Sequence, residues 1–378
     1  MKIGTNKKQA QGYNAFILEK FPPKGGFQFS NKLIQKANSA TLLLGKLDGI
    51  TQLLPDLDFF LFMYIRKDAS SSSQIEGTRA TMIDAIEAES HTSEKLPEDV
   101  DDILHYINAL NYGLERLKDF PLSLRFIREI HQELMKDVRT THFSDPGNFR
   151  KTQNWIGGTS PSNAYFVPPP IHEMEFALKD FENFLHEDDE LLPLIKAGII
   201  HAHFETIHPF LDGNGRTGRI LITLYLWLES LLERPVLFLS SYFKKHKEVY
   251  YDRLSRYHSE NGDIEVWLDF FLEGISEIAK EAIQTVKEIT LLREEDMHKI
   301  QALGKTAAES SLKVLLELFK LPIINIATIQ SWTGFSRQGS QNLIDRFIEM
   351  KILQIKDEHK IYGRSYIYKR YIDIFAEN

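Results

Sequence analysis

The sequence of 378 residues contains no cysteine. Disulfide bonds, thiolate nucleophiles and cysteine-ligated zinc sites are therefore excluded. Basic side chains are also in the minority, with 45 Lys and Arg against 53 Asp and Glu and a formal net charge of −8. This balance argues against nonspecific nucleic-acid binding by the whole molecule.

Long hydrophobic runs are missing as well. The longest strongly apolar stretch, RILITLYLWLESLL (219–232), carries Glu229 and is shorter than the roughly 20 residues that cross a bilayer. The first ten residues, MKIGTNKKQA, lack the apolar segment of a secretory signal. We therefore expect a cytoplasmic protein with no membrane span, in which residues 219–232 form a buried helix.

Most of the chain has apolar residues spaced three and four apart, which is typical of helices. We expect a mainly α protein in three parts: a helical N-terminal region over 1–100, a helical core over 101–300 and a smaller unit over 305–378. The first long helix is expected to begin at Asn31 and to end at Gly49.

The main break from helix is DPGNFRKTQNWIGGTSPSNAYFVPPP (145–170). Turn-forming Pro-Gly, Gly-Gly and Ser-Pro pairs alternate there with β-favouring aromatic and branched residues. We expect a short β-hairpin or flap near 147–168.

The last seventy residues have a different pattern. A helix over 311–320 precedes NIATIQSWTGFSRQGSQNLIDRFIEMKIL, which predicts helix, turn at Gly334 and second helix, and ILQIKDEHKIYGRSYIYKRY alternates like two strands and a turn. A winged helix-turn-helix is the simplest interpretation. Its second helix offers side chains suited to DNA, although the same residues would suit any solvated helix face: Ser336, Arg337, Gln338, Ser340, Gln341 and Asn342.

The stretch GNGRTGR (213–219) has the spacing Gly-x-Gly-x-x-Gly of a dinucleotide-binding loop. Such a loop follows a strand and is followed by an acidic residue about twenty positions on. Here a helical pattern ending at His208 precedes the glycines, and Glu229 is too close. The Walker pattern GxxxxGK[ST] is also absent, so neither standard nucleotide motif applies.

Three nearby histidines do not form a metal motif. A zinc-binding HExxH needs histidines four apart with Glu after the first, whereas His203 and His208 are five apart. His201 and His203 point to different helix faces. We interpret His201 and His203 as packing or surface histidines.

The same loop fits an anion site better. Gly213 and Gly215 allow backbone N–H groups to converge on an anion, and the helix that follows adds its positive N-terminal end. Arg216 and Arg219 are three apart on that helix, so both can face the same anion. This pattern predicts a polyphosphate site.

Two further residues suit chemistry on a polyphosphate. Asp212 offers an oxygen to Mg²⁺, which usually binds one or two carboxylates together with substrate phosphates. His208 supplies a base with a pKa near neutrality. A plain connection between two helices, with an Asp-Gly-Asn-Gly turn that has no function, would explain the glycines. It would not explain the His-Pro-Phe sequence or the two arginines.

Together these residues read HPFLDGNGRTGR, which resembles the signature HPFx[DE]GNGRxxR of the Fic family at every fixed position. The resemblance covers roughly 101–289 and implies the Fic-type helical core. It also implies that the protein transfers AMP from ATP to a Ser, Thr or Tyr hydroxyl of a target protein or of itself.

By this resemblance each motif residue has an expected role. His208 would deprotonate the hydroxyl, and Asp212 would hold Mg²⁺ between the α- and β-phosphates. The side chain of Asn214 and the amides of Gly213 and Gly215 would cradle the phosphates. Arg216 and Arg219 would bind the β/γ end.

The flap and one later helix complete the expected site. Asn154, Trp155 and Ile156 would pair with the target segment by β-addition. In the family this segment also borders the nucleotide, which here includes Ile156, Gly157 and Gly158. Tyr250 or Tyr251 would touch the adenine, and for both a place in the core is an equal alternative.

A second motif is SSQIEG (72–77), which resembles the inhibitory [ST]xxxE[GN] motif of the family. Ser72 and Glu76 are four apart, hence on one helix face. Gly77 either leaves room for another backbone or ends the helix. By the resemblance Glu76 pairs bidentately with Arg219 and blocks productive ATP binding, and it could instead position a water molecule that removes AMP from modified targets.

Two other readings stay open. The C-terminal unit predicts a DNA-binding regulator or toxin–antitoxin-type protein with a nucleotide-sensing Fic core. In the second reading the protein transfers another group than AMP, such as UMP, phosphate or phosphocholine. The family also suggests a homodimer.

Overall fold

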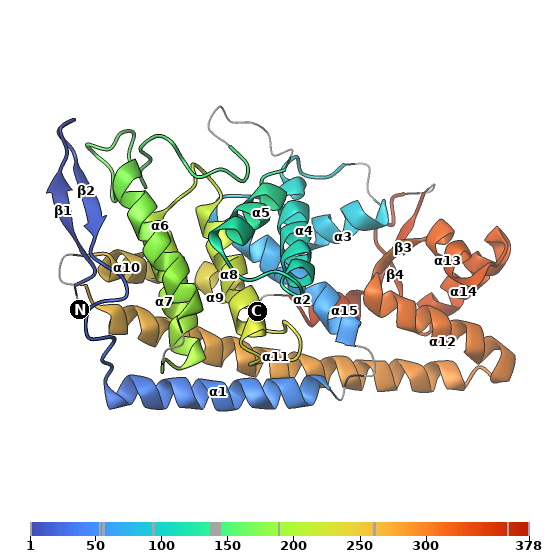
Figure 1. Ribbon diagram of the computed structural model, residues 1–378. Coiled ribbons are helices and arrows are strands. Elements are labelled where there is room, and N and C mark those ends of the chain that lie inside the picture. Colours follow the sequence, from blue (N-terminus) through green and yellow to red (C-terminus); the bar gives the residue numbers. More distant parts are fainter. Residues whose placement is uncertain are drawn as a thin grey trace.

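The computed structural model describes residues 2–52, 54, 57–92, 95–136, 145–187, 190–259, 262–360 and 363–376. The described part is mainly helical, as the sequence predicted (Figure 1). Two small antiparallel sheets lie at opposite ends of the molecule.

The base of the molecule is a pair of long helices, α1 (Asn31–Thr51) and α11 (Ile264–Gln301), which lie side by side (Figure 1). The apolar positions of α1 recur every three or four residues and are buried: Leu33, Ala37, Ala40, Leu44 and Leu47. Helix α1 continues past Gly49, where the sequence predicted its end, because Leu47 and Thr51 still bury their side chains one turn apart.

The centre is formed by α7 (Pro193–Ile207) and α8 (Asn214–Leu228), which pack against each other. Every residue of α7 from Leu194 to Ile207 is buried, so this helix has no solvent face. Around the pair lie α2 (Leu57–Ile75), α4 (Val100–Arg116), α5 (Leu124–Leu134), α6 (Ile171–His186) and α10 (Lys247–Tyr257). The predicted buried helix over 219–232 is thus the central helix α8, which ends at Leu228.

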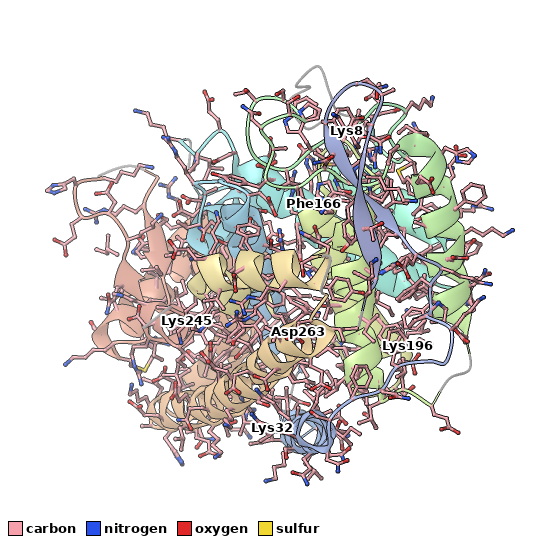
Figure 2. All side chains as sticks on the ribbon, turned by 90° about the vertical axis from the view of Figure 1, so that its left-hand side faces the viewer. Lys8, Lys32, Phe166, Lys196, Lys245 and Asp263 are labelled. Atoms are coloured by element: carbon pink, nitrogen blue, oxygen red, sulfur yellow. The ribbon has the colours of Figure 1, made fainter. Side chains whose placement is uncertain are left out.

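The sequence did not reveal the N-terminal hairpin of β1 (Gly4–Lys8) and β2 (Asn14–Leu18). Its first strand, GTNKK, has no hydrophobic alternation and only one β-favouring residue, Thr5, so it gives no strand signal. The hairpin packs on the region predicted as a flap: Phe16 N–H donates to Val167 O over 2.9 Å, and the rings of Phe16 and Phe166 are 5.9 Å apart. Figure 2 shows Lys8 at the outer tip of the hairpin and Phe166 beside it.

The flap is less regular than predicted. Instead of two strands it contains a single antiparallel bridge, between Ile156 and Phe166. Gly157 and Gly158 turn the chain with φ values of 71° and 68°, so the backbone leaves extended geometry directly after the bridge.

The C-terminal part follows α12 (Lys305–Lys320). It consists of β3 (Ile323–Asn325), α13 (Ile326–Thr333), α14 (Arg337–Glu349), β4 (Gln354–Ile355) and β5 (Ser365–Ile367), with the sheet order β3–β5–β4 and the short α15 (Lys369–Asp373) at the end. This chain order is the one expected for a winged helix-turn-helix, with the turn at Gly334. DNA binding stays a prediction, and one of its candidate residues was wrong, because Ser340 is fully buried.

The C-terminal part packs directly on the rest of the chain. Helix α12 contacts α2, and β3 contacts α3 (Met82–Ser90). The buried Asp296 of α11 accepts hydrogen bonds from Tyr368 Oη and Arg370 Nη1, each over 2.7 Å. Among the described residues, none of the helices is both long and apolar enough to cross a bilayer.

Candidate active site

His208 is the residue at which α7 ends. Its backbone has φ 49° and ψ 60°, a left-handed conformation that turns the chain out of the helix. The imidazole Nδ1 lies 3.2 Å from Glu205 O, so Nδ1–H donates to that carbonyl and Nε2 keeps its lone pair. Burial lowers the pKa of His208 to about 4, which keeps the ring neutral and able to accept a proton near neutral pH.

Two side chains hold the backbone of His208 from the flap side. Arg150 Nε donates to His208 O over 3.0 Å, and Asn154 Nδ2 donates to His208 O and to Phe210 O over 3.3 and 2.8 Å. The side-chain amide of Asn154 thus holds the motif loop, and pairing of this segment with a target by β-addition stays a prediction. Arg150 was missed, since a buried Arg that donates to backbone carbonyls leaves no motif in the sequence.

Hydrogen bonds within the loop that follows His208 also fix its shape. Asn214 accepts a hydrogen bond from Phe210 N over 2.9 Å and donates to Phe210 O over 2.8 Å. The Asn214 amide therefore holds the loop in the described structure, and a further contact of this side chain with phosphate stays a prediction. The role of the amide here is to fix the shape of the loop that carries His208.

His131, a second missed residue, supports the same loop from α5. It stacks on the ring of Phe210 at 3.7 Å, accepts from Gly147 N at Nδ1 over 2.9 Å, and so donates from Nε2 to Asp212 O over 3.0 Å. Burial lowers the pKa of His131 to about 4, as this neutral tautomer requires. A single His on an amphipathic helix gave no signal for this role.

Arg219 lies buried between α8 and α2. Its Nε donates to Ser72 Oγ over 2.8 Å, and its Nη2 donates to Ser72 O over 3.0 Å and to Glu76 Oε1 over 2.7 Å. The predicted pairing of Arg219 with Glu76 is therefore present. It is a single hydrogen bond instead of a bidentate pair, and Nε and Nη2 also donate to Ser72.

Glu76 sits against the N-terminal turn of α8. A Cβ atom at Gly215 would collide with Glu76 Oε1, so the carboxylate rests directly on the Cα of that glycine. Burial raises the pKa of Glu76, but the charge and hydrogen bond of Arg219 outweigh it and hold this pKa below its usual value. An ionised carboxylate thus occupies the place where helix-terminal amides favour an anion.

Gly77 and Gly213 each have a positive φ at the turn where a helix ends or begins. Gly77 has φ 107° and ends α2, and a Cβ there would meet nothing within 4 Å. Of the two predicted reasons for Gly77, ending the helix is the one observed. Gly213 has φ 76° and starts α8, so its glycine is required by the turn that follows Asp212.

Arg216 does not share the partners of Arg219. It is buried beside Asp102, with Nη1 3.4 Å from Oδ1, and its Nη2 is 3.8 Å from Asp212 Oδ2. The two arginines of the motif are therefore paired with different acidic residues, Arg216 with Asp102 and Asp212 and Arg219 with Glu76. The Nε of Arg216 is buried without a described partner.

Asp212 keeps about half of its side chain exposed, and its Oδ1 accepts from Gly213 N over 2.6 Å. The described residues contain no group of three or more His, Asp or Glu side chains that could hold a metal alone. A single carboxylate fits the mode in which Mg²⁺ is shared between one acid and the phosphates of a substrate.

A cavity of about 700 Å³ opens between α2, the flap, α7, α8 and α10. Its lining contains predicted residues from both motifs, the flap and α10: Glu76, Trp155, Ile156, Gly157, His208, Gly215, Arg219, Tyr250 and Tyr251. Gly158, Asp212, Gly213, Asn214 and Arg216 are not part of this lining. The structure thus joins segments that are more than 170 positions apart in the sequence.

The two tyrosines of α10 differ. Tyr250 is fully buried and its Oη lies 2.9 Å from His201 Nε2, whereas Tyr251 is 43% exposed. Tyr250 is thus a core aromatic that also lines the cavity, whereas Tyr251 lines the cavity and is partly exposed to solvent. His201 and His203 are buried packing residues, as predicted, with His203 stacked on Phe21 at 3.7 Å.

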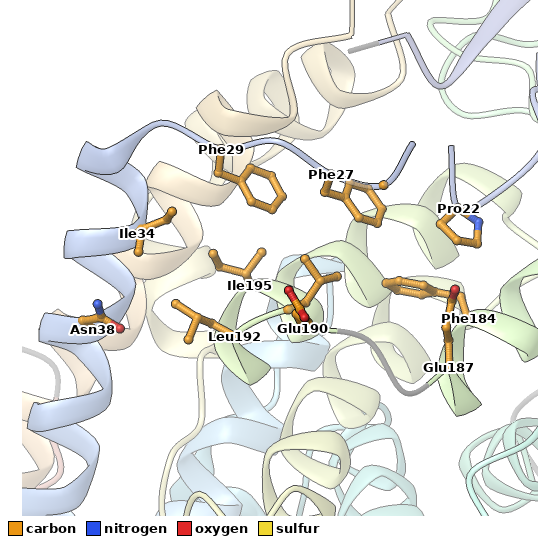
Figure 3. Close-up of a pocket in the computed structure, with 12 residues that line it drawn as sticks. Pro22, Phe27, Phe29, Ile34, Asn38, Phe184, Glu187, Glu190, Leu192 and Ile195 are labelled. Carbon is orange, nitrogen blue, oxygen red and sulfur yellow. The ribbon is translucent and has the colours of Figure 1, made fainter. Parts of the chain in front are cut away.

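A second cavity, of about 600 Å³, lies between the start of α1, α6 and α7 (Figure 3). Its lining is mainly apolar, with Phe27, Phe29, Leu192 and Ile195, and it also contains two glutamates. None of the predicted site residues line it, so the chemistry is concentrated in the first cavity.

Comparisons with known proteins match the part of the chain that holds most of this site. Residues 34–115 match the model of the Fic/DOC family N-terminal region, and residues 121–226 match the Fic/DOC family model. The chain therefore carries a Fic/DOC family domain, preceded by the family's N-terminal region.

Relatives and solved structures point to the same fold. The chain is 31% identical over 176 residues to the protein adenylyltransferase Fic of Culex quinquefasciatus and 32% identical over 181 residues to a probable protein adenylyltransferase of Aquifex aeolicus. These matches cover 46% and 47% of this chain but only 31% and 52% of the relatives. A crystal structure of a Fic family protein from Desulfovibrio desulfuricans G20 superposes with a TM-score of 0.58 and 18% identity, covering 90% of this chain and 97% of the other.

Proposed function

We propose that this protein transfers AMP from ATP to a Ser, Thr or Tyr hydroxyl of a target protein, and that Glu76 holds it inactive. The observation that carries the proposal is one cavity that contains both a neutral His208 and the Glu76–Arg219 pair. A base and an anion-binding arginine on the walls of one cavity are what nucleotidyl transfer to a hydroxyl requires.

His208 is the base in this scheme. Its Nδ1–H is engaged by Glu205 O, so Nε2 accepts the proton as the hydroxyl oxygen bonds to the α-phosphorus. The bond from the α-phosphorus to the bridging oxygen breaks, and pyrophosphate leaves with the electron pair. General base catalysis of this kind contributes roughly 10²- to 10⁴-fold in rate.

The phosphates belong at the N-terminal end of α8. The amides at this end and the guanidinium of Arg219 favour negative charge. Mg²⁺ held by Asp212 would offset charge on the α- and β-phosphates when it is bound. Glu76 competes for the same position, since its carboxylate contacts both Gly215 and Arg219.

The test compares wild type, Glu76→Gly and Glu76→Gly/His208→Ala, each incubated with isotopically labelled ATP, Mg²⁺ and cell lysate. We expect AMP on the enzyme or on a lysate protein to rise strongly in Glu76→Gly and to disappear in the double variant. Mass spectrometry of the labelled products identifies the transferred group and the modified residue. Glu229→Gly, at the exposed C-terminal end of α8, is the control for an unrelated Glu-to-Gly change.

Equal labelling of wild type and Glu76→Gly would contradict inhibition by Glu76. Labelling that survives His208→Ala would contradict the role of the base, and a mass other than AMP would identify another transferred group.

Removal of AMP is the second activity that Glu76 supports. An ionised carboxylate in the cavity can accept a proton from water, whereas a glycine cannot. AMP-modified target from the Glu76→Gly reaction is therefore expected to lose AMP when wild type and Mg²⁺ are added. Retention of AMP by this target would restrict Glu76 to inhibition.

A further inference from the structure

Glu205 is a buried acid that neither motif includes. It lies on α7, three residues before His208, and it lines the same cavity. Its Oε2 is 3.7 Å from His208 Nδ1, and its Oε1 is buried with no described hydrogen-bond partner. A buried carboxyl oxygen without a hydrogen-bond partner is costly for folding alone, which points to a use in the site.

We propose that Glu205 is a positioning residue for His208, which orients the imidazole and supplies the countercharge when Nε2 takes the proton from the target hydroxyl. This inference rests on the proposed AMP transfer and adds to it a residue that acts through the base. The backbone carbonyl of Glu205 selects the tautomer of His208, and the carboxyl group of Glu205 stabilises the imidazolium form of His208.

The geometry follows from the way α7 ends. The left-handed backbone of His208 folds the ring back over the last turn, where Glu205 lies. The Nδ1 edge therefore faces both the carbonyl and the carboxyl group of one residue. A carboxyl group on the far nitrogen of a catalytic imidazole is a known way to fix its orientation and to stabilise its charged form.

The charges around the pair set when the carboxyl group can act. Burial raises the pKa of Glu205, Arg219 on α8 lowers it and Glu76 after α2 raises it, and together they bring it to about 8. His208 is faced by Arg150, which lowers its pKa, and by Glu76 and Asp212, which raise it. The remaining groups that face Glu205 are His201 on α7 and, on α10, Tyr250 and Tyr251.

Release of Glu76 therefore does two things. It frees Arg219, and it removes a negative charge that disfavours the carboxylate form of Glu205. Protonation of His208 favours that form further, because opposite charges a few ångströms apart stabilise each other in a buried site. Inhibition by Glu76 thus acts on the base as well as on the phosphate site.

The experiment uses full-length protein with Glu76→Gly in every variant, so that activity is measurable. Glu205→Gln is compared with Glu205→Asp and with Glu229→Gln, whose side chain is exposed at the far end of α8. The readouts are kcat against pH, the Kd of Mg-ATP and the pKa of His208 from NMR of ¹³C-labelled histidine, assigned with His208→Ala.

For Glu205→Gln we expect kcat to fall about 10- to 100-fold and the NMR pKa of His208 to fall by about one unit or more, because one unit corresponds to tenfold in stabilisation of the imidazolium. The acid limb of the pH profile should move to lower pH, and the Kd of Mg-ATP should stay within about twofold. Glu205→Asp keeps a countercharge and should retain more activity than Glu205→Gln.

An unchanged kcat and an unchanged His208 pKa in Glu205→Gln would overturn the inference. Equal losses in Glu205→Gln and Glu205→Asp with no change in the His208 pKa would assign Glu205 to packing and overturn it as well. If Glu76→Gly itself transfers no AMP, the proposed function fails, while the NMR comparison still decides whether Glu205 controls the charge of His208.

Discussion

The Nη2 of Arg219 lies 2.7 Å from Oε1 of Glu76, although the two residues are 143 positions apart. This contact links the SSQIEG segment at the end of α2 to α8, which begins within HPFLDGNGRTGR. Since Arg219 is fully buried, its charge needs a partner in every state of the protein. In the proposed function, Glu76 and an anionic ligand compete to provide that partner.

Ser72 and Glu76 both accept hydrogen bonds from Arg219. The Oγ of Ser72 accepts from Nε, so Ser72→Ala removes one of the three hydrogen bonds that keep the guanidinium on α2. We expect AMP transfer by Ser72→Ala to lie between that of wild type and that of Glu76→Gly, because the remaining bonds still favour the inhibited position. Labelled-ATP incorporation measures it, with the neighbouring buried Ser71→Ala as a control. Wild-type activity in Ser72→Ala would show that its hydroxyl contributes nothing to inhibition.

The stabilising effect of Glu76 should depend on pH. The pKa of this carboxyl is held below its usual value of roughly 4.3, so its contribution to stability is present above that value and is lost as pH falls through the lower folded-state pKa. Glu76→Gln should therefore melt below wild type near pH 7, with the gap shrinking below about pH 4. Calorimetric Tm values between pH 3 and 7 check this, and a gap independent of pH would exclude the charge as its cause.

Two parts of this picture could be predicted from the sequence. The signature around His208 and the pair formed by Ser72 and Glu76 follow local rules, because each motif lies within one helix end where spacing fixes the side-chain direction. The meeting of Arg219 with Glu76 followed only from the resemblance to a family, since no periodicity relates residues 143 positions apart.

Other parts could not be predicted because they depend on packing. The bracing of the loop by Arg150 and His131 uses backbone carbonyls as acceptors, and every sequence offers such acceptors at every position. Glu205 reads as an ordinary polar residue until α7 proves to be buried on all sides. The commitment of Asn214 to Phe210 likewise depends on the shape of the loop, which the motif alone does not give.

Buried histidines should make the protein sensitive to acid. His203 is fully buried, and burial lowers its pKa to about 3, below the roughly 6.5 of an unfolded chain. A depressed pKa means that unfolding takes up a proton, so stability falls as pH drops from about 6.5 towards 3, by about 1.4 kcal/mol per pH unit for each such group. His203→Phe should reduce the slope of unfolding free energy against pH by about one proton in urea titrations between pH 4 and 6.5. A slope equal to that of wild type would mean that His203 is protonated in the folded protein.

Asp296 should control how firmly the C-terminal part is attached to α11. It is fully buried and accepts from Tyr368, Arg370 and Lys299, each over 2.7 Å, so it joins α15 and Tyr368, the residue between β5 and α15, to the long helix. Asp296→Asn removes the charge while two cations remain beside it. We expect the free energy of unfolding to fall by about 1–3 kcal/mol, the cost of an impaired buried hydrogen-bonding group.

The loss in Asp296→Asn should be local before it is global. Amide hydrogen exchange should speed up in β5 and α15 while that of α7 and α8 stays near wild type, because the core helices do not contact Asp296 in the described hydrogen bonds. Asp373→Asn is the matched control, since Asp373 is half exposed and its pair with Lys369 lies on the surface. Uniform acceleration in all helices would show instead that the C-terminal part and the Fic domain unfold as one unit.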